Sequence, residues 1–224
     1  PTGTHFLGQL IRGVDLTSEA GLEMNVVLES GNIASGIVLD ANGLVVPEVD
    51  IDVNWVAGGR LYTPEDNTDL LGRYQVVVPM GEFLFRYEPP RGSRLMAVEI
   101  DSTLVTQDMV LDVVLESGLL LQGNITDDQG LPAAGVEVDL RNLFTGEKII
   151  LANNTTDQAG DYIVAAPLGT YQLRYIPPRD GHLVARDIRG FQLDADTVKN
   201  QVLDTGHLVT VKVEGTGGIA LAGA

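Results

Sequence analysis

The chain repeats itself with a period of 87 to 88 residues, and no other feature of the sequence limits its fold as strongly. The run VVLESG at 26–31 returns at 113–118, and a third copy begins with VLDTG at 202–206. Two further matched pairs are GRY at 72–74 with GDY at 160–162, and RYEPPR at 86–91 with RYIPPR at 174–179. Self-similarity held in register over this many positions indicates copies of one structural unit.

Short stretches of alternating apolar and polar residues make up each repeat. Examples are Val49–Val53, Val136–Leu140 and Tyr171–Tyr175, and this two-residue period is typical of a strand with one buried face. Turn residues such as Asp40–Gly43 separate the stretches, which leaves room for about seven strands per repeat. No window has a helical apolar stripe. The sequence therefore predicts an all-β chain of tandem seven-stranded sandwiches, because an isolated hairpin cannot bury its apolar face.

The phase of the repeat divides the chain into four parts. We expect the second half of a repeat at 1–30, full β-sandwich repeats at 31–117 and 118–205, and the opening strand of a further repeat at 206–224. A window on a longer array is the favoured interpretation of the incomplete ends. The alternative is that they pair with neighbouring chains, since an unpaired sandwich edge is a template for strand addition. Any secretion signal is expected outside these residues.

Three motifs of the second repeat carry a family resemblance. Gly123–Val138 is GNITDDQGLPAAGVEV, Thr156–Tyr162 is TDQAGDY, and Pro167–Leu173 is PLGTYQL. Together they resemble carboxypeptidase-regulatory-like domains; the first repeat departs from the pattern with VPEV at 46–49. The resemblance implies a transthyretin-like (prealbumin-like, Ig-like) β-sandwich related to Cna protein B-type stalk domains. It also implies spacer, stalk, carbohydrate-associated or accessory roles without choosing among them.

Several kinds of chemistry are excluded by composition. The chain has no Cys, which removes disulfides, thiolate metal sites and Cys nucleophiles, and its three His residues stand apart. No serine lies in a nucleophile elbow, so we predict that the chain is not an enzyme. Related stalk domains form Lys–Asn bonds, but the first full repeat has no Lys. Lys212 opens the last partial repeat, where a solvated strand position is the favoured interpretation.

Charge favours cations over anionic partners. The net charge is −17 and the isoelectric point is near 4.3, which argues against nucleic acid or an anionic membrane surface as a partner. Asp66, Asp69, Asp127 and Asp128 lie in acidic loops and are candidate calcium ligands, because Ca²⁺ prefers oxygen donors. None of these loops has EF-hand spacing, so solvated turn residues are the favoured alternative. We expect no other cofactor. The acidic composition also suggests a saline setting.

Two further site predictions concern carbohydrate. Trp55 and Tyr62 flank a Gly-Gly turn and are candidates for stacking on a sugar ring, although a core or inter-domain position is the favoured alternative for Trp55. Asn124, Asn153 and Asn154 match the N-glycosylation acceptor pattern, which is short and frequent by chance.

These observations together predict a non-catalytic, secreted structural protein at the cell surface. It would be a tandem-repeat stalk, filament or surface-layer component, with adjacent repeats or copies of itself as partners. Self-assembly through its incomplete terminal repeats is a further expectation. The alternative is a carbohydrate-binding or adhesive accessory module with glycans as partners. No apolar run reaches the roughly 18 residues needed to cross a bilayer.

Overall fold

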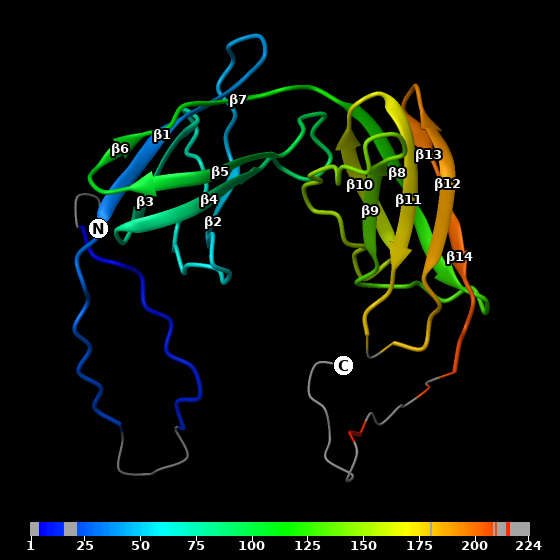
Figure 1. Ribbon diagram of the computed structural model, residues 1–224, viewed down its shortest axis with the longest axis horizontal. Coiled ribbons are helices and arrows are strands. Elements are labelled where there is room, and N and C mark those ends of the chain that lie inside the picture. The colour runs from blue at the N-terminus through cyan, green and yellow to red at the C-terminus, as the bar shows by residue number, and fades with distance from the viewer. Residues whose placement is uncertain (1–4, 16–21, 180, 208, 210–213, 216–224) are drawn as a thin grey trace.

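The structure is a computed structural model that describes residues 5–15, 22–179, 181–207, 209 and 214–215. Every regular element among these residues is a β-strand. The strands form two sandwiches that lie side by side (Figure 1). The predicted all-β fold is confirmed, and the described part of the chain contains no helix that could span a membrane.

The first sandwich is built from the strands β1 (Asn32–Asp40), β2 (Asp50–Trp55), β3 (Arg73–Val78), β4 (Gly81–Glu88), β5 (Val98–Val105), β6 (Met109–Val110) and β7 (Val113–Leu115). One sheet has the order β3-β1-β6, with β7 also pairing with β1, and the other has the order β2-β4-β5. Strand β1 is antiparallel to β3 and parallel to β6 and β7. Apolar side chains of both sheets meet in one core.

The second sandwich repeats this topology strand for strand. Its strands are β8 (Leu119–Asp127), β9 (Glu137–Asn142), β10 (Asp161–Ala166), β11 (Gly169–Ile176), β12 (Arg186–Leu193), β13 (Thr197–Val198) and β14 (Gln201–Leu203). The sheets have the orders β10-β8-β13, with β14 also on β8, and β12-β11-β9. A separate apolar cluster fills this sandwich. The division of the chain at residues 30, 117 and 205 stays a prediction.

A buried tyrosine pair links the two sheets of each sandwich. The Tyr74 hydroxyl donates to the carbonyl of Leu111 at 2.8 Å and lies 2.7 Å from the Tyr87 hydroxyl. Since Tyr74 has only one hydroxyl hydrogen, Tyr87 donates to Tyr74. Tyr162 and Tyr175 form the same pair at 2.9 Å in the second sandwich. Burial raises the pKa of Tyr74 and of Tyr175 to about 12, so both hydroxyls keep their hydrogen bonds at neutral pH.

Two glycines allow the chain to cross closely over strands β1 and β8. A Cβ atom on Gly36 would overlap the carbonyl oxygen of Leu111, and one on Gly123 would overlap that of Lys199. Gly36 and Gly123 occupy the same position in the two repeats, 87 residues apart. They lie where the segments between β6 and β7, and between β13 and β14, contact the sheet closely.

Candidate functional site

The four candidate calcium ligands serve mainly as hydrogen-bond acceptors in turns. Asp66 accepts from the Thr63 hydroxyl at 2.6 Å, and Asp128 accepts from that of Thr205 at 2.9 Å. Asp69 and Asp127 each accept two backbone N–H groups of their own turn. The backbone N–H of Arg73 is the main reason that the pKa of Asp69 is lowered.

Calcium binding stays a prediction. Within the described ranges, no group of three or more His, Asp or Glu residues is placed to hold a metal ion. A thermal midpoint that does not change when Ca²⁺ is added would contradict the prediction, because a ligand that binds only the folded state raises its stability.

The two candidate sugar-stacking residues have different surroundings. Trp55 is partly buried against the first core, with its ring 4.4 Å from that of Phe83 between centroids. Tyr62 is 45% exposed, and its ring lies beside Gly8. Only Tyr62 therefore presents a largely open ring, and glycan stacking stays a prediction.

The three candidate glycosylation residues all use their side-chain nitrogen as a hydrogen-bond donor. The Nδ2 atom of Asn124 donates to the carboxylate of Asp161 at 2.7 Å. That of Asn154 donates to the carbonyl of Val138 at 3.0 Å. That of Asn153 donates to the carbonyl of Pro89 at 3.2 Å, across to the other sandwich. Glycosylation at these positions stays a prediction.

Arginines of the first sandwich make most of the polar contacts to the second, and we call this contact region the joint. Arg86 on β4 donates to the carbonyl of Leu151 at 2.8 Å. Arg91 donates to the carbonyl of Asp161 at 2.7 Å and to the carboxylate of Asp157 at 3.2 Å. The Pro-Pro sequence after β4 ends the strand and leads directly into this contact, because proline cannot donate to a further ladder bond.

A bidentate ion pair and a short β-bridge complete the joint. Arg94 holds the carboxylate of Asp196 with both terminal nitrogens, one of them at 2.9 Å. Beside this pair, Leu95 bridges to Ser117, and the backbone N–H of Met96 donates to the carbonyl of Glu116 at 2.9 Å. A cavity of about 480 Å³ remains between the sandwiches. Exposed ion pairs contribute only about 0–1 kcal/mol each, so the joint sets orientation more than stability.

The β-bridge of the joint occurs at two other places in the chain. Phe6 bridges to Ser30, and Leu183 bridges to Thr205, in the same way that Leu95 bridges to Ser117. The flanking backbone hydrogen bonds recur as Leu7 to Glu29 and Gly31 to His5, and as Val184 to Asp204 and Gly206 to His182. Both ends of each sandwich thus carry the same backbone connection.

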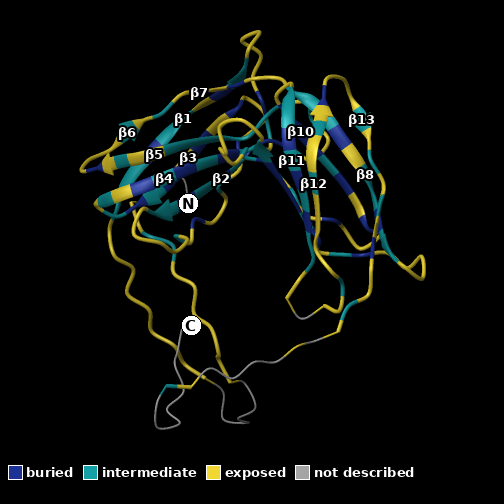
Figure 2. Cartoon of the chain, turned by 45° about the vertical axis from the view of Figure 1, so that its right-hand side comes forward, coloured by how far each residue is buried: buried dark blue, intermediate teal, exposed yellow. Residues whose placement is uncertain are grey.

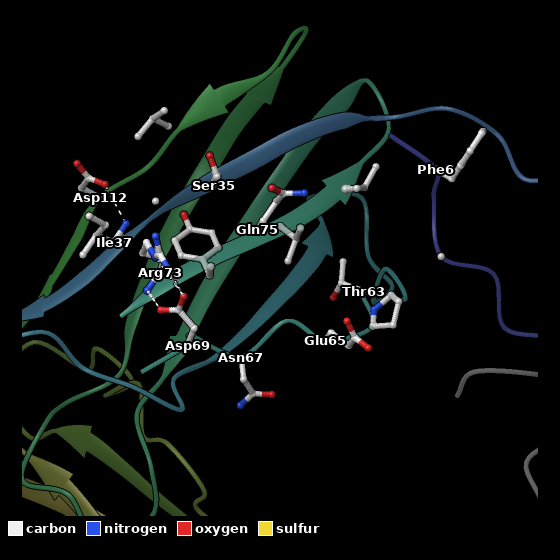
Figure 3. A pocket seen from close by; sticks show the side chains of 17 residues that line it. Phe6, Ser35, Ile37, Thr63, Glu65, Asn67, Asp69, Arg73, Gln75 and Asp112 are labelled. Carbon is white, nitrogen blue, oxygen red and sulfur yellow. Dashed lines mark hydrogen bonds and ion pairs between the residues drawn. The ribbon is translucent and has the colours of Figure 1, made fainter. Parts of the chain in front are cut away.

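A cleft of about 950 Å³ lies on the first sandwich (Figure 3). It is lined by the edge strand β3, by the loop that carries Thr63 and Glu65, and by Phe6. Asp69 pairs with Arg73 at 3.0 Å at its base. With Glu65 and Asp112 also in the lining, carboxylates outnumber the single arginine, and the cleft favours a cationic occupant.

The recurrent Arg-Tyr-x-Pro-Pro-Arg motif looks architectural from the sequence, because its prolines end a strand. The structure gives its arginines a further role as donors across the joint. The signal in the sequence was the return of both arginines at a spacing of 88. Each of the two arginines donates to a backbone carbonyl, which has no residue type to recognise, and Arg91 also donates to the carboxylate of Asp157.

No protein-family model matches the chain, and no curated protein matches it. Solved structures similar to it include the Bacillus anthracis TIE protein, with 16% identity, 79% of this chain and 34% of that chain covered, and a TM-score of 0.32. The shaft pilin SpaA from Lactobacillus rhamnosus GG has 8% identity, 81% and 100% coverage, and a TM-score of 0.34. A streptococcal ancillary pilin has 14% identity, 84% and 68% coverage, and a TM-score of 0.30.

The chain spans about a third of the Bacillus anthracis chain that it matches. Similarities at this level of identity and TM-score carry no argument about function. The fold therefore rests on the strands, sheets and cores described above, and the resemblance to carboxypeptidase-regulatory-like domains stays a prediction.

Proposed function

We propose that this chain is a non-catalytic structural part of an extracellular or cell-surface stalk, filament or surface layer, in which sandwiches of one repeat act as spacers. The observation that carries the proposal is the joint: Arg86, Arg91 and Arg94 tie one sandwich to the next through backbone carbonyls and carboxylates. A spacer needs such an arrangement, because relative motion is the default for linked domains with a small polar interface.

The repeated connection supports the same proposal. The backbone bridge at 95 and 117 recurs at 6 and 30 and at 183 and 205, so this backbone part of the connection does not depend on particular side chains. Repeat arrays whose units contact only their neighbours are extended in one dimension. The acidic surface, with a net charge of −17, keeps such an array soluble and favours a saline environment.

The test is to loosen the joint without unfolding either sandwich. In the triple variant Arg86→Ala, Arg91→Ala, Arg94→Ala, we expect small-angle scattering to show a larger spread of inter-domain distances, with a midpoint of thermal unfolding close to that of the parent. The matched control is Arg12→Ala, Arg186→Ala, Arg189→Ala, which carries the same charge change away from the joint. A parent chain as flexible as the triple variant would refute a fixed spacer, as would native material that shows no fibre or lattice in electron micrographs.

A glycan-binding or adhesive accessory module is the second proposal. Tyr62 favours it, since the ring is 45% exposed and lies against Gly8, which lines the cleft. Aromatic rings beside polar clefts are suited to sugar stacking. In a glycan array, Tyr62→Ala should abolish any binding that the parent shows, and unchanged binding would refute this site.

A further inference from the structure

Residues 5–15 and 22–31 form an extended arm that runs away from the first sandwich, coloured blue at the lower left of Figure 1. By the repeat, this arm corresponds to strands β5 to β7 and β12 to β14. Gly13 in the arm has a φ of +72°, and the matching residues Ser102 and Gly190 have φ values of +50° and +75°. The arm therefore already carries the backbone irregularity that these strands have in a complete sandwich.

Apolar side chains of the arm are exposed where their counterparts are buried. Leu28 is 43% exposed, whereas the matching Leu115 and Leu203 are 0% and 1% exposed. Val26 is 46% exposed, whereas Val113 is 5% exposed. Figure 2 shows the arm as almost entirely exposed. In the complete sandwiches, the first four strands cover these positions.

Four positions that line the cleft on the first sandwich correspond in the repeat to four positions on the second sandwich's side of the joint. Thr63, Glu65, Asp69 and Arg73 line the cleft, and they match Leu151, Asn153, Asp157 and Asp161 at a constant shift of 88. The latter four form the hydrogen bonds of the joint with the first sandwich, where their partners are Arg86, Glu88, Pro89 and Arg91.

The backbone of this surface is formed in advance. Glu65 and Asn153 take the same left-handed conformation, with φ values of +58° and +49°, which is uncommon for residues other than glycine. The edge strand next to it is less covered than its counterpart: Ile163 and Ala165 on β10 are half-buried and buried, whereas the matching Gln75 and Val77 on β3 are exposed and half-buried. The cleft therefore has the backbone form of the second sandwich's side of the joint.

We propose that the arm and the cleft together bind the first four strands of another sandwich of this repeat, ending in Arg-Tyr-x-Pro. The arm supplies the last three strands of the sandwich that the two form together. The arginine of the bound unit enters the cleft and donates to the carbonyl of Thr63, as Arg86 donates to the carbonyl of Leu151 in the joint. One arginine suffices, because Asp69 is already paired with Arg73. This inference rests on the proposed tandem arrangement and names the partner of its exposed end.

The occupant is a four-stranded unit rather than a whole sandwich. The paired segments 5–7 and 29–31 already stand where 94–96 and 116–118 stand in the joint, and a whole sandwich would bring its own copy of this pair to the same place. A second copy of this chain would have to open one of its complete sandwiches to offer four free strands. We therefore assign as the occupant a separate four-stranded unit of this repeat, not a second copy of this chain.

The test is a fusion in which Gly118–Pro177 of this chain precedes Pro1 of the full chain. This probe contains Arg174, which matches Arg86 in the repeat. It has Ile176 at the position of Glu88, so no further carboxylate is placed beside Glu65. Hydrogen exchange measured by mass spectrometry should slow at least about tenfold at residues 26–28 and 73–77, towards the rates of 113–115 and 161–165. Unchanged exchange at residues 26–28 in a fusion that retains native exchange in β8 to β14 would overturn the proposal.

Two variants test the cleft and the arm separately, the first in the fusion and the second in the unfused chain, where it does not depend on folding of the fusion. Arg174→Ala in the added unit should restore fast exchange at 73–77 while leaving 26–28 protected; no change at 73–77 would overturn the role of the cleft. Leu28→Asp should leave the thermal midpoint of the unfused chain unchanged, whereas Leu115→Asp should lower it strongly. A large effect of Leu28→Asp on the unfused chain, or dimers of that chain in mass photometry, would overturn the assignment of a separate four-stranded unit as the occupant. Flexible joints would instead refute only the spacer function.

Discussion

Replacing Thr156 by valine should destabilise the second sandwich through two hydrogen bonds that have no substitute. Thr156 is only 5% exposed; its hydroxyl donates to the carbonyl of Ala133 at 2.6 Å and accepts the N–H of Val136 at 2.9 Å. Valine keeps the volume and leaves both backbone groups unpaired. At about 1–3 kcal/mol for each unsatisfied group, and with partial relaxation, the loss should be about 2–4 kcal/mol.

The single tryptophan makes the measurement specific to one sandwich. Trp55 packs on the first core, so its fluorescence follows unfolding of the first sandwich, whereas circular dichroism follows both. With a urea dependence of about 1.5 kcal/mol/M for a domain of this size, the second transition should move down by about 2 M. The tryptophan transition should stay in place.

The matched variant is Thr68→Val, because Thr68 makes the same two bonds, to the carbonyl of Val46 and from the N–H of Val49. It should move the tryptophan transition and leave the second sandwich unchanged. A loss below about 0.5 kcal/mol in either variant, which is the size of an ordinary surface substitution, would refute the reasoning that these hydroxyls satisfy buried backbone groups.

Three further predictions concern the glycines, the tyrosines and the joint. Gly123→Ala should cost the second sandwich about 1–3 kcal/mol by overpacking, since the new Cβ would overlap the carbonyl of Lys199; urea unfolding checks this, and Gly130→Ala, with open space around it, controls for the loss of glycine alone. Because burial raises the pKa of Tyr74 and Tyr175 to about 12, their stabilisation is fully present below pH 10 and lost as the pH rises towards 12; ultraviolet titration should show tyrosinate from these residues only there, and earlier ionisation without unfolding would contradict it. Asp196→Asn should remove the charge partner of Arg94 and reduce the salt dependence of the scattering profile between about 0.05 and about 0.5 M, the range over which exposed pairs are screened; a salt response equal to that of the parent would count against this ion pair.

The strands could be predicted from the sequence wherever alternation runs for five or more residues. Val49–Val53 and Val136–Leu140 begin one residue before β2 and β9 and end two residues before these strands end, and Tyr171–Tyr175 lies inside β11. Alternation is sufficient there because one face is buried and the other is wet. Strands of two or three residues, such as β6 and β13, are too short to show a period, so their parallel pairing with β1 and β8 could not be foreseen.

The candidate sites were less accessible to sequence reasoning, for a physical reason. Asp69 and Asp127 look like free carboxylates in an acidic loop, yet each accepts N–H groups of its own turn, which is the usual role of Asp in such turns. Trp55 looks like a binding residue because it occurs once, but its ring packs on Phe83. Residue type alone does not say whether a polar or aromatic group is already satisfied by its neighbours.

The joint shows which part of a repeat is free to vary. At three places the backbone makes the same bridge with the same pair of flanking hydrogen bonds. The side chain beside it is His5 at the first place, Arg94 at the second and His182 at the third. Arg94 holds Asp196 with two nitrogens, whereas His5 approaches the matching Asp108 only to 3.8 Å. Since the backbone bonds fix the connection in each case, the neighbouring ion pair adjusts how firmly two units are held without changing where they meet.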